Sequence, residues 1–341
     1  MKRAVALAAL ALAVPREARP CAPAPPPEAE VAIVEEEALI VWDPDAKQQH
    51  FVRRARFDTG AASFGFLVPS PSVPDLAAVD DTVFDDLAQA IEPETVVETG
   101  PKLFPFSLVL APFTMFLGRS AEKSIAGAPR VAVLKTQRVG GYDAVVLAAD
   151  DPAALADWLD ERGFAKTDDL EAWLTAYVDK KWKLTAFTIA KNADGSSVAT
   201  SAVRMTFATD EPFYPYREPA SQRSDSMTGP RALRVFLVAP DPMRGMLAGK
   251  AWPGETVYRA PHGLDEVAGV KVAADAWLQA WVDRSAPRNG VDDVFFAPHR
   301  DAPIVKPPPN VVDDRTTIPI PVDVLLLIGL IVWWRRRKRA K

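Results

Sequence analysis

Apolar positions divide the first third of the chain into short segments whose spacing predicts strands. Alternating or continuous apolar residues over 31–42, 49–57 and 64–68 are typical of strands, and a turn rich in aspartate and proline separates the first two. We expect these three strands to pair with one another. Segment 80–91 instead has apolar residues at helical spacing behind an acidic start that complements the helix dipole, which predicts a helix.

The middle of the chain predicts two amphipathic helices. Asp151 is a suitable N-cap before Pro152 at the first helical position, and Gly163 is expected to end this helix. Asp168 begins the second helix, whose apolar residues follow a period of 3.6. The residues of this stripe are Leu170, Trp173, Leu174, Tyr177 and Val178. We expect the stripe to face the core.

Further strands are predicted on both sides of the two helices. Residues 130–139 and 142–148 are expected to form strands joined by a turn at Gly140 and Gly141, because paired glycines accept the positive φ of tight turns. Residues 183–191 and 197–207 predict a β-hairpin. Strands are also expected over 232–238, 267–272 and 294–297, and a short helix over 274–282.

These elements predict an α+β body over 31–297 with a mixed or largely antiparallel sheet and packed helices. The chain has 341 residues, of which 48% are hydrophobic, so a substantial core can be buried. The body divides at residue 216, where a resemblance described below ends, into 31–216 and a C-terminal extension over 217–297.

The N-terminus predicts a secretory signal peptide. A basic start precedes the apolar stretch 4–14, which reaches only about 16 Å as a helix and is too short to cross a bilayer core of about 30 Å. We expect cleavage between Ala13 and Ala24, so residues 1–24 form the processing region. Cys21 is the single cysteine, which excludes an intramolecular disulfide, and its neighbours disfavour a lipoprotein site.

The C-terminus predicts a proline-rich stalk over 298–321, a transmembrane segment over 322–334 and a basic cytoplasmic tail over 335–341. The apolar residues of the anchor are Val324, Leu325, Leu326, Leu327, Ile328, Leu330, Ile331, Trp333 and Trp334. The residues that set the topology are Arg335, Arg336, Arg337, Lys338 and Arg339. Because basic residues stay on the cytoplasmic side, we expect a single-pass protein of the cell membrane with an extracytoplasmic body, periplasmic or at the cell surface.

The length of the predicted anchor leaves alternatives open. Counted from Ile318, 17 residues reach roughly 26 Å as a helix, at the short end for a membrane span. A helix lying on the membrane surface is disfavoured because the run has no polar face, and a cleavable sorting tail is a further alternative. The internal apolar stretch 103–117 contains Pro105 and Pro112, so we expect it to pack on the body rather than dip into a membrane.

Charge narrows the range of partners. The chain has 40 basic and 45 acidic residues, of which ten basic and one acidic lie in the first twenty positions and the C-terminal tail. The rest of the chain therefore has a net charge of about −14. Such a surface repels nucleic acid, which is therefore not an expected partner. Membrane lipid is the expected partner of the C-terminal segment.

The sequence contains no recognisable catalytic motif, and we predict no catalytic, cofactor-binding or metal-ligating residue and no cofactor. His50, His262 and His299 are far apart and lack ligand-like spacing. Adjacent acidic residues suit calcium binding or acid–base catalysis, although solvated faces and helix starts use them more often. These pairs and runs lie at 35–37, 80–81, 168–169 and 292–293.

One aromatic and proline-rich block resembles a known family. Its residues are Phe64, Gly65, Phe66, Leu67, Val68, Pro69 and Pro71. Together with the segments 139–177 and 205–216, this block resembles the bacterial family named domain of unknown function 2330 (DUF2330), over about Val31 to Tyr216. The resemblance implies an exported bacterial protein, often anchored at its C-terminus, and implies no activity. Relatives usually begin with cysteines, whereas this chain has only Cys21, so any disulfide of the relatives is absent.

The leading hypothesis is a non-catalytic module of the bacterial cell envelope that binds a protein, peptide or glycan. The alternative is a cell-envelope hydrolase that uses acidic residues, and a third hypothesis is a spacer without a ligand. The block 64–71 suits either a recognition groove or a core strand that leaves its sheet at Pro69, and the core strand is the favoured interpretation.

Overall fold

The chain divides into two compact units. The first, here called the body, comprises residues 1–91 and 128–306, and the second unit comprises residues 92–127 and 307–341. The computed structural model describes residues 23–24, 31–59, 63–106, 142–148, 151–162, 164–190, 197–223, 232–285 and 287–339. The predicted signal peptide therefore lies outside the described residues except for Pro23 and Ala24, and so do the strand 130–139 and its glycine turn.

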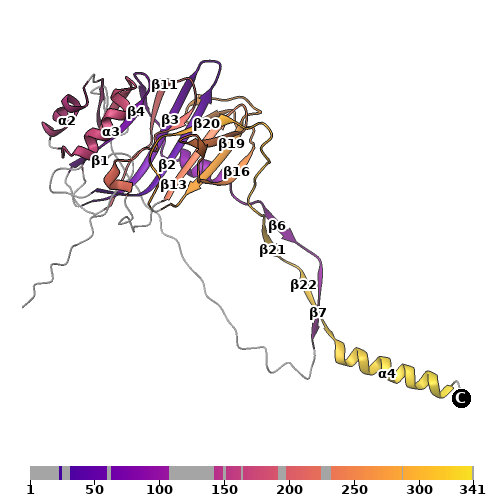
Figure 1. Cartoon of the computed structure of the whole chain (residues 1–341). Coiled ribbons are helices and arrows are strands. Elements are labelled where there is room, and N and C mark those ends of the chain that lie inside the picture. Colours follow the sequence, from indigo (N-terminus) through magenta and orange to yellow (C-terminus); the bar gives the residue numbers. More distant parts are fainter. Residues whose placement is uncertain are drawn as a thin grey trace, which may run out of the picture. The chain divides into compact units, whose positions relative to one another are not determined.

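The body is built around an eight-stranded sheet with the order β16-β19-β13-β2-β3-β11-β5 and β10 beside β3 (Figure 1). Its strands are β16 (Glu255–Pro261), β19 (Trp277–Asp283), β13 (Ala232–Ala239), β2 (Val31–Asp43), β3 (Gln48–Thr59), β11 (Val203–Ala208), β5 (Asp75–Ala78) and β10 (Ser197–Ala199). Only β13 and β2 pair in parallel among these described strands. The largely antiparallel sheet is thus confirmed.

The central strand β2 is covered on both faces. Ala38, Ile40 and Trp42 join one hydrophobic cluster, whereas Leu39 and Val41 join another. Successive side chains of a strand point to opposite faces, so both sides of the sheet need an apolar cover here. This explains why the segment appears in the sequence as a continuous apolar run.

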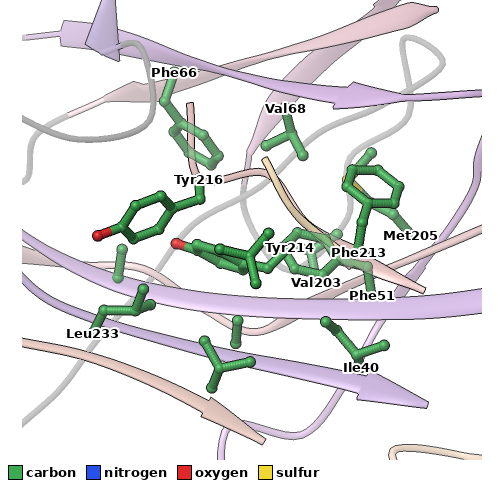
Figure 2. Packing of buried hydrophobic residues seen from close by; sticks show 14 of the residues in the cluster. Ile40, Phe51, Phe66, Val68, Val203, Met205, Phe213, Tyr214, Tyr216 and Leu233 are labelled. Atoms are coloured by element: carbon green, nitrogen blue, oxygen red, sulfur yellow. The ribbon is translucent and has the colours of Figure 1, made fainter. Parts of the chain in front are cut away.

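Two smaller sheets pack against the Ile40 face. One contains β1 (Pro23–Ala24), β4 (Ser63–Ser70), β9 (Lys183–Ala190) and β8 (Asp143–Leu147). The other contains β12 (Phe213–Tyr214), β20 (Val294–Pro298), β14 (Met243–Leu247) and β15 (Lys250–Ala251), and a separate short hairpin joins β17 (Glu266–Val267) to β18 (Val270–Lys271). Figure 2 shows Tyr214 and Tyr216 between Phe66 on one side and Ile40 on the other.

Helices cover the remaining apolar faces of the body. Helix α1 (Val83–Ala90) buries Phe84 in the cluster on the Leu39 face of the large sheet. Helices α2 (Pro152–Asp160) and α3 (Asp168–Val178) share a third cluster with Leu67 of β4. A 3-10 turn, η2 (Ala220–Arg223), follows β12. The body is therefore mostly β with few helices, a coarse α+β fold.

The local signals for α2 and α3 are confirmed. The Asp151 carboxylate accepts a hydrogen bond from the backbone N–H of Ala153 at 3.0 Å, and the Thr167 hydroxyl accepts one from Leu170 at 3.2 Å. Caps of this kind satisfy N–H groups that have no partner inside the helix. The predicted apolar stripe of α3 is buried in full. The predicted strands 31–42 and 49–57 are also confirmed as β2 and β3.

Two strand pairings were wrongly predicted. The strand 64–68 forms as β4 but pairs with β1 and β9 instead of β2 and β3. The strands 183–191 and 197–207 form, yet β9 pairs with β4 and β8, while β10 and β11 pair with β3. The reason is that β9, like β4, has apolar residues on both faces, with Phe187 towards the large sheet and Leu184 towards α3.

The helix predicted over 274–282 is wrong. The segment forms strand β19, which lies between β13 and β16. Leu278 and Trp281 face opposite sides, and the apolar residues on both faces imitate helical spacing. Gln279 is also buried, but its side-chain carbonyl accepts hydrogen bonds from Met243 N at 2.9 Å and Arg259 Nε at 3.1 Å.

The described residues of the second unit form paired strands and one helix. β6 (Thr95–Glu98) pairs in parallel with β21 (Asn310–Asp313), and β7 (Pro101–Phe106) pairs in parallel with β22 (Thr316–Pro321). These two strand pairs are here called the ribbon, and α4 (Val322–Arg339) follows β22 directly (Figure 1). Part of the proline-rich stretch is therefore paired with residues of an internal segment, and the start of the apolar stretch 103–117 pairs with β22. The rest of that stretch, 107–117, lies outside the described residues.

Replacing Phe66 by alanine tests the packing between the sheets. Its ring stacks on Phe187 at 4.8 Å and lies 4.5 Å from the guanidinium carbon of Arg53. We expect Phe66→Ala to lower the free energy of unfolding of the body by about 3–5 kcal/mol, because a large buried ring leaves a cavity. Chemical denaturation followed by tryptophan fluorescence measures this. Val73→Ala is the control, since Val73 is 65% exposed; equal unfolding midpoints for the two variants would contradict the packing.

Candidate functional site

Helix α4 has the most exposed apolar surface among the described helices. Its apolar side chains from Val324 to Trp334 are between 37% and 69% exposed, with Leu326 the most open. Soluble proteins rarely expose such a contiguous apolar surface unless it contacts a membrane, a ligand or another protein. α4 is therefore the first candidate for a functional surface.

The charged residues at the two ends of α4 complement its helix dipole. Asp323 lies in the first turn, and Arg336, Arg337, Lys338 and Arg339 lie in the last turn. An acidic residue at the N-terminus and basic residues at the C-terminus both stabilise the helix dipole. The basic side chains also pack on aromatic rings: the Lys338 Nζ atom lies 3.7 Å from the Trp334 ring centre. Aromatic and basic residues together are typical of a membrane–water boundary.

Helix α4 begins where the transmembrane segment is predicted to begin, so its apolar part is shorter than the 17 residues counted from Ile318. The helix begins at Val322, whereas Ile318 to Pro321 belong to strand β22. From Val322 to Trp334 the helix reaches only roughly 20 Å. Among the helices that the structure describes, none combines the length and the apolar character needed to cross a membrane.

Ion pairs hold the ribbon together next to α4. Lys102 of β7 pairs with Asp313 of β21, and Arg315 pairs with Asp313 at 2.8 Å and with Glu98 of β6 at 3.1 Å. Hydrogen bonds from Arg315 and Lys102 hold the pKa of Asp313 well below its usual range. Exposed pairs contribute little individually, so these contacts chiefly fix the register of the parallel strands.

A second candidate site is a cluster of buried charges inside the body, here called the Arg288 cluster. Arg288 lies near three carboxylates: Nη1 is 3.7 Å from Glu36 and 3.9 Å from Glu218, and Nε is 3.9 Å from Asp283. Glu36 also pairs with Arg53 at 2.7 Å. All five side chains are at most 6% exposed. Buried charges of this kind are stable only when paired.

The Arg288 cluster keeps Glu36 ionised. Burial alone would raise the pKa of the Glu36 carboxyl. The charges of Arg53 and Arg288, together with hydrogen bonds from Arg53 and Tyr214, outweigh this effect and lower the pKa from 4.5 to about 2. Tyr216 donates a hydrogen bond to Asp283 at 2.6 Å, and burial together with that carboxylate raises the pKa of the tyrosine hydroxyl. Glu36 is thus a fixed negative charge near neutral pH.

Asp293 is a separate buried acid. Tyr177 of α3 donates a hydrogen bond to its Oδ1 atom at 2.8 Å, and the backbone N–H of Arg217 donates another at 3.2 Å. Burial raises the pKa of Asp293, although these hydrogen bonds oppose the rise. The hydrogen bond from Tyr177 to Asp293 therefore holds α3 against the loop before β20, which is a structural role.

The acidic pairs of the sequence have different surroundings in the structure. Asp168 and Asp169 lie in the first turn of α3, a helix start as expected. Glu35 and Glu37 are partly exposed and pair with Arg56 and Arg54 of β3, whereas Glu36 and Asp293 are buried. Both buried acids belong to acidic runs noted in the sequence, but their burial was not predicted. A signal existed for Glu36 alone, because the basic residues of the next predicted strand stand opposite 35–37 in an antiparallel pair.

His50 and His262 have separate structural partners. His50 Nδ1 lies 2.9 Å from the Thr206 hydroxyl, and burial followed by the nearby charge of Arg204 lowers the His50 pKa. His262 Nε2 lies 3.1 Å from the Ala90 carbonyl. In the described part of the chain, no three His, Cys, Asp or Glu side chains are arranged to hold a metal ion.

The family-like block lies in strand β4. Phe64, Phe66, Leu67 and Val68 are buried, and the strand continues through Pro69, which pairs with Leu184 of β9. A Cβ atom on Gly65 would lie 3.1 Å from the Phe164 ring and from the Phe187 carbonyl oxygen, so only glycine fits without a shift. These positions form the core of the body.

The described surface of the body includes a shallow hollow with an aromatic floor. It encloses about 450 Å³ and is lined by Trp182 and Phe295, with Pro71 beside them. Lys47 and Asp210, which pair at 2.8 Å, belong to its polar rim. Half-buried aromatic rings with a charged rim are typical of surfaces that bind another molecule.

Comparison with known proteins gives one family. The sequence model of the family described as "Uncharacterized protein conserved in bacteria (DUF2330)" matches residues 15–241, which is 227 of the 341 residues. No curated protein matches the chain. Among solved structures, the crystal structure of baculovirus P35 is similar with a TM-score of 0.40 and 9% identity, covering 80% of this chain and 98% of that chain. A likeness at this level says nothing about what the chain does.

Replacing Glu36 by glutamine tests its pKa. Because the folded pKa of about 2 lies below the unfolded value of 4.5, ionised Glu36 stabilises the fold above pH 4.5, and this contribution is lost as the pH falls towards 2. We expect the unfolding free energy of the wild type to fall by roughly 3 kcal/mol more than that of Glu36→Gln across this window. Denaturant titrations at several pH values measure the difference.

The matched control for Glu36 is its neighbour. Glu35 carries the same group one position away, but its side chain is 59% exposed and its pair with Arg56 faces solvent. We expect Glu35→Gln to follow the wild-type pH profile closely. Identical profiles for the wild type and Glu36→Gln would show that Glu36 is not held ionised by its arginines.

Replacing Arg288 by methionine tests the cluster as a unit. The change leaves Glu218 and Asp283 buried without the cation between them, and we expect the body to lose about 3–5 kcal/mol of stability. Arg300→Met is the control: Arg300 is 77% exposed and pairs with Asp241 at 3.0 Å, so its loss is expected to cost under about 1 kcal/mol. Thermal denaturation of both variants gives the comparison, and a wild-type melting temperature for Arg288→Met would contradict the assignment.

Proposed function

Since the chain belongs to the bacterial family DUF2330, whose description assigns no activity, we propose that it is an exported, membrane-attached protein of the bacterial cell envelope. Its body serves as a non-catalytic binding or structural module. Helix α4 inserts into the membrane, and the basic tail stays on the cytoplasmic side. The membrane-spanning role of residues 322–334 belongs to this proposal.

The observation that supports membrane attachment is the exposed apolar surface of α4 next to a basic end. Lipid is the partner that fits both features, since apolar side chains favour the hydrocarbon core and arginines extend along the helix to reach phosphates. The helix is short for a full crossing. Local thinning of the bilayer and long basic side chains compensate for a mismatch of this kind.

The observation that supports a binding role is the hollow lined by Trp182 and Phe295. Aromatic side chains contribute large contact areas at low entropic cost, which favours peptide, protein or glycan ligands. The ribbon joins the C-terminal strands to an internal segment of the chain, so α4 is attached through two paired strands instead of a single flexible linker.

The alternative is a hydrolase that uses acidic residues. The Arg288 cluster is the set of described carboxylates that best suits it, because Glu36, Glu218 and Asp283 all approach one arginine. Each of these side chains is at most 1% exposed, and a substrate needs access to the acid and base. Their burial and ion pairing favour a structural role, which makes the binding module the better supported proposal.

Charged substitutions in α4 test membrane attachment. We expect Leu326→Asp combined with Ile328→Asp to release the full-length protein from membranes, because each aspartate at the centre of an inserted helix costs about 3 kcal/mol. Flotation of membranes on a density gradient measures the bound fraction. Val73→Asp, which adds a charge at an exposed position of the body, is the control and is expected to float like the wild type.

The same preparations test the topology. Protease added to intact spheroplasts is expected to degrade the body and leave a tag at the C-terminus protected. Flotation of the α4 variant at the wild-type level, or protection of the body, would contradict the proposal.

A further inference from the structure

The C-terminal helix and an internal apolar segment start from the same end of the ribbon. Strands β7 and β22 run in parallel, and their last residues, Phe106 and Pro321, are register partners. The residues that follow are Ser107 on one strand and Val322, the first residue of α4, on the other. The chain beyond Phe106 therefore leaves the ribbon beside the start of α4.

The internal segment matches α4 in length and polarity. Residues 107–117, SLVLAPFTMFL, contain no charged residue, and both this segment and the apolar run 324–334 have 11 residues. A basic residue follows each of them closely, Arg119 in one case and Arg335 in the other. Two apolar segments of equal length thus follow strand ends that are register partners.

The length of chain outside the described residues permits contact with α4. Residues 107–141 number 35, which at about 3.3 Å each reach roughly 115 Å when extended. A path out along the 18 residues of α4 and back to the end of the ribbon needs roughly 54 Å, which leaves roughly 61 Å for the return to Tyr142. Because the ribbon already holds the two starting points together, little further loop-closure entropy opposes the contact.

We infer that residues 107–117 cover part of the apolar surface of α4, so that the membrane is contacted by two segments of one chain. A tethered segment has a high effective concentration at its target, which favours it over a second copy of α4 as the occupant. The membrane role rests on the proposed function, whereas the contact between the two segments does not. The inference also explains how attachment is achieved by a helix that is itself short for a bilayer.

Cysteine cross-linking in the full-length protein tests the contact. With Cys21→Ser as background, Leu110→Cys is combined in turn with cysteine at each of Leu325, Leu326, Leu327 and Ile328, which together surround α4 because successive residues differ by about 100°. The positive control combines Lys102→Cys with Asp313→Cys, since these side chains form an ion pair across the ribbon. Membranes are treated with a short bismaleimide, and the cross-linked chain is identified by its shift on a gel.

We expect the control pair to cross-link and Leu110→Cys to link to one side of α4 several-fold more than to the opposite side. A cross-linked control without any link from Leu110→Cys would mean that lipid alone covers α4, and this would overturn the inference. Dimers in place of the cross-linked single chain would overturn it in favour of a second copy. If the control pair does not cross-link, the ribbon strands are not paired as described, and the inference that depends on them is overturned as well.

A separate readout distinguishes this inference from the proposed function. The wild-type protein is floated with membranes from the same cells, and the cross-linking is repeated after solubilisation in mild detergent. A protein that does not float but still links Leu110→Cys to α4 would contradict membrane attachment and support the contact. A protein that floats without the link would support attachment and contradict the contact.

Discussion

Burial of both faces of the large sheet is the constraint on which the rest of the body depends. Strand β2 directs Ile40 to one side and Leu39 to the other, and neither side chain is exposed. A sheet with two apolar faces is stable in water only when other elements cover both. The two smaller sheets supply one cover and α1 supplies the other. Helices α2 and α3 then cover the outer face of β4 and β9, which gives a layered body.

Burial of both faces of the sheet also determines which charged side chains must be paired inside the body. Glu36 lies on a buried strand between Glu35 and Glu37, so alternation turns it inward while its neighbours reach the surface. An unpaired carboxylate would be very costly there, and Arg53 and Arg288 offset that cost. The charges are thus consistent with a cluster that fixes the position of β2 relative to the loop at Arg288. Burial, more than the number of carboxylates, separates this cluster from an acid–base site.

The sequence predicts elements well where a cap or a one-sided apolar stripe marks them, and it predicts one doubly buried strand, β19, wrongly. The cap at Asp151 and the stripe that contains Trp173 are local signals, and both predict their helices correctly. Strand β19 has no solvent face, so its period of two is hidden and a helix was predicted instead. Pairing is harder still, because β6 and β21 lie 215 positions apart and no local pattern links them. The inward position of Glu36 depends in turn on which strand pairs with which.

The pairing of β6 with β21 follows from where the two segments leave the body. The C-terminal segment is held to β16 by two backbone hydrogen bonds between Val305 and Arg259, at 2.7 and 2.9 Å. His262, just beyond β16, contacts the carbonyl of Ala90 at the end of α1 at 3.1 Å. Both exits are therefore fixed next to the same strand, which places the starts of the two ribbon segments near each other. Isolated strand pairs are only marginally stable, so the ribbon depends on a folded body to bring its halves together.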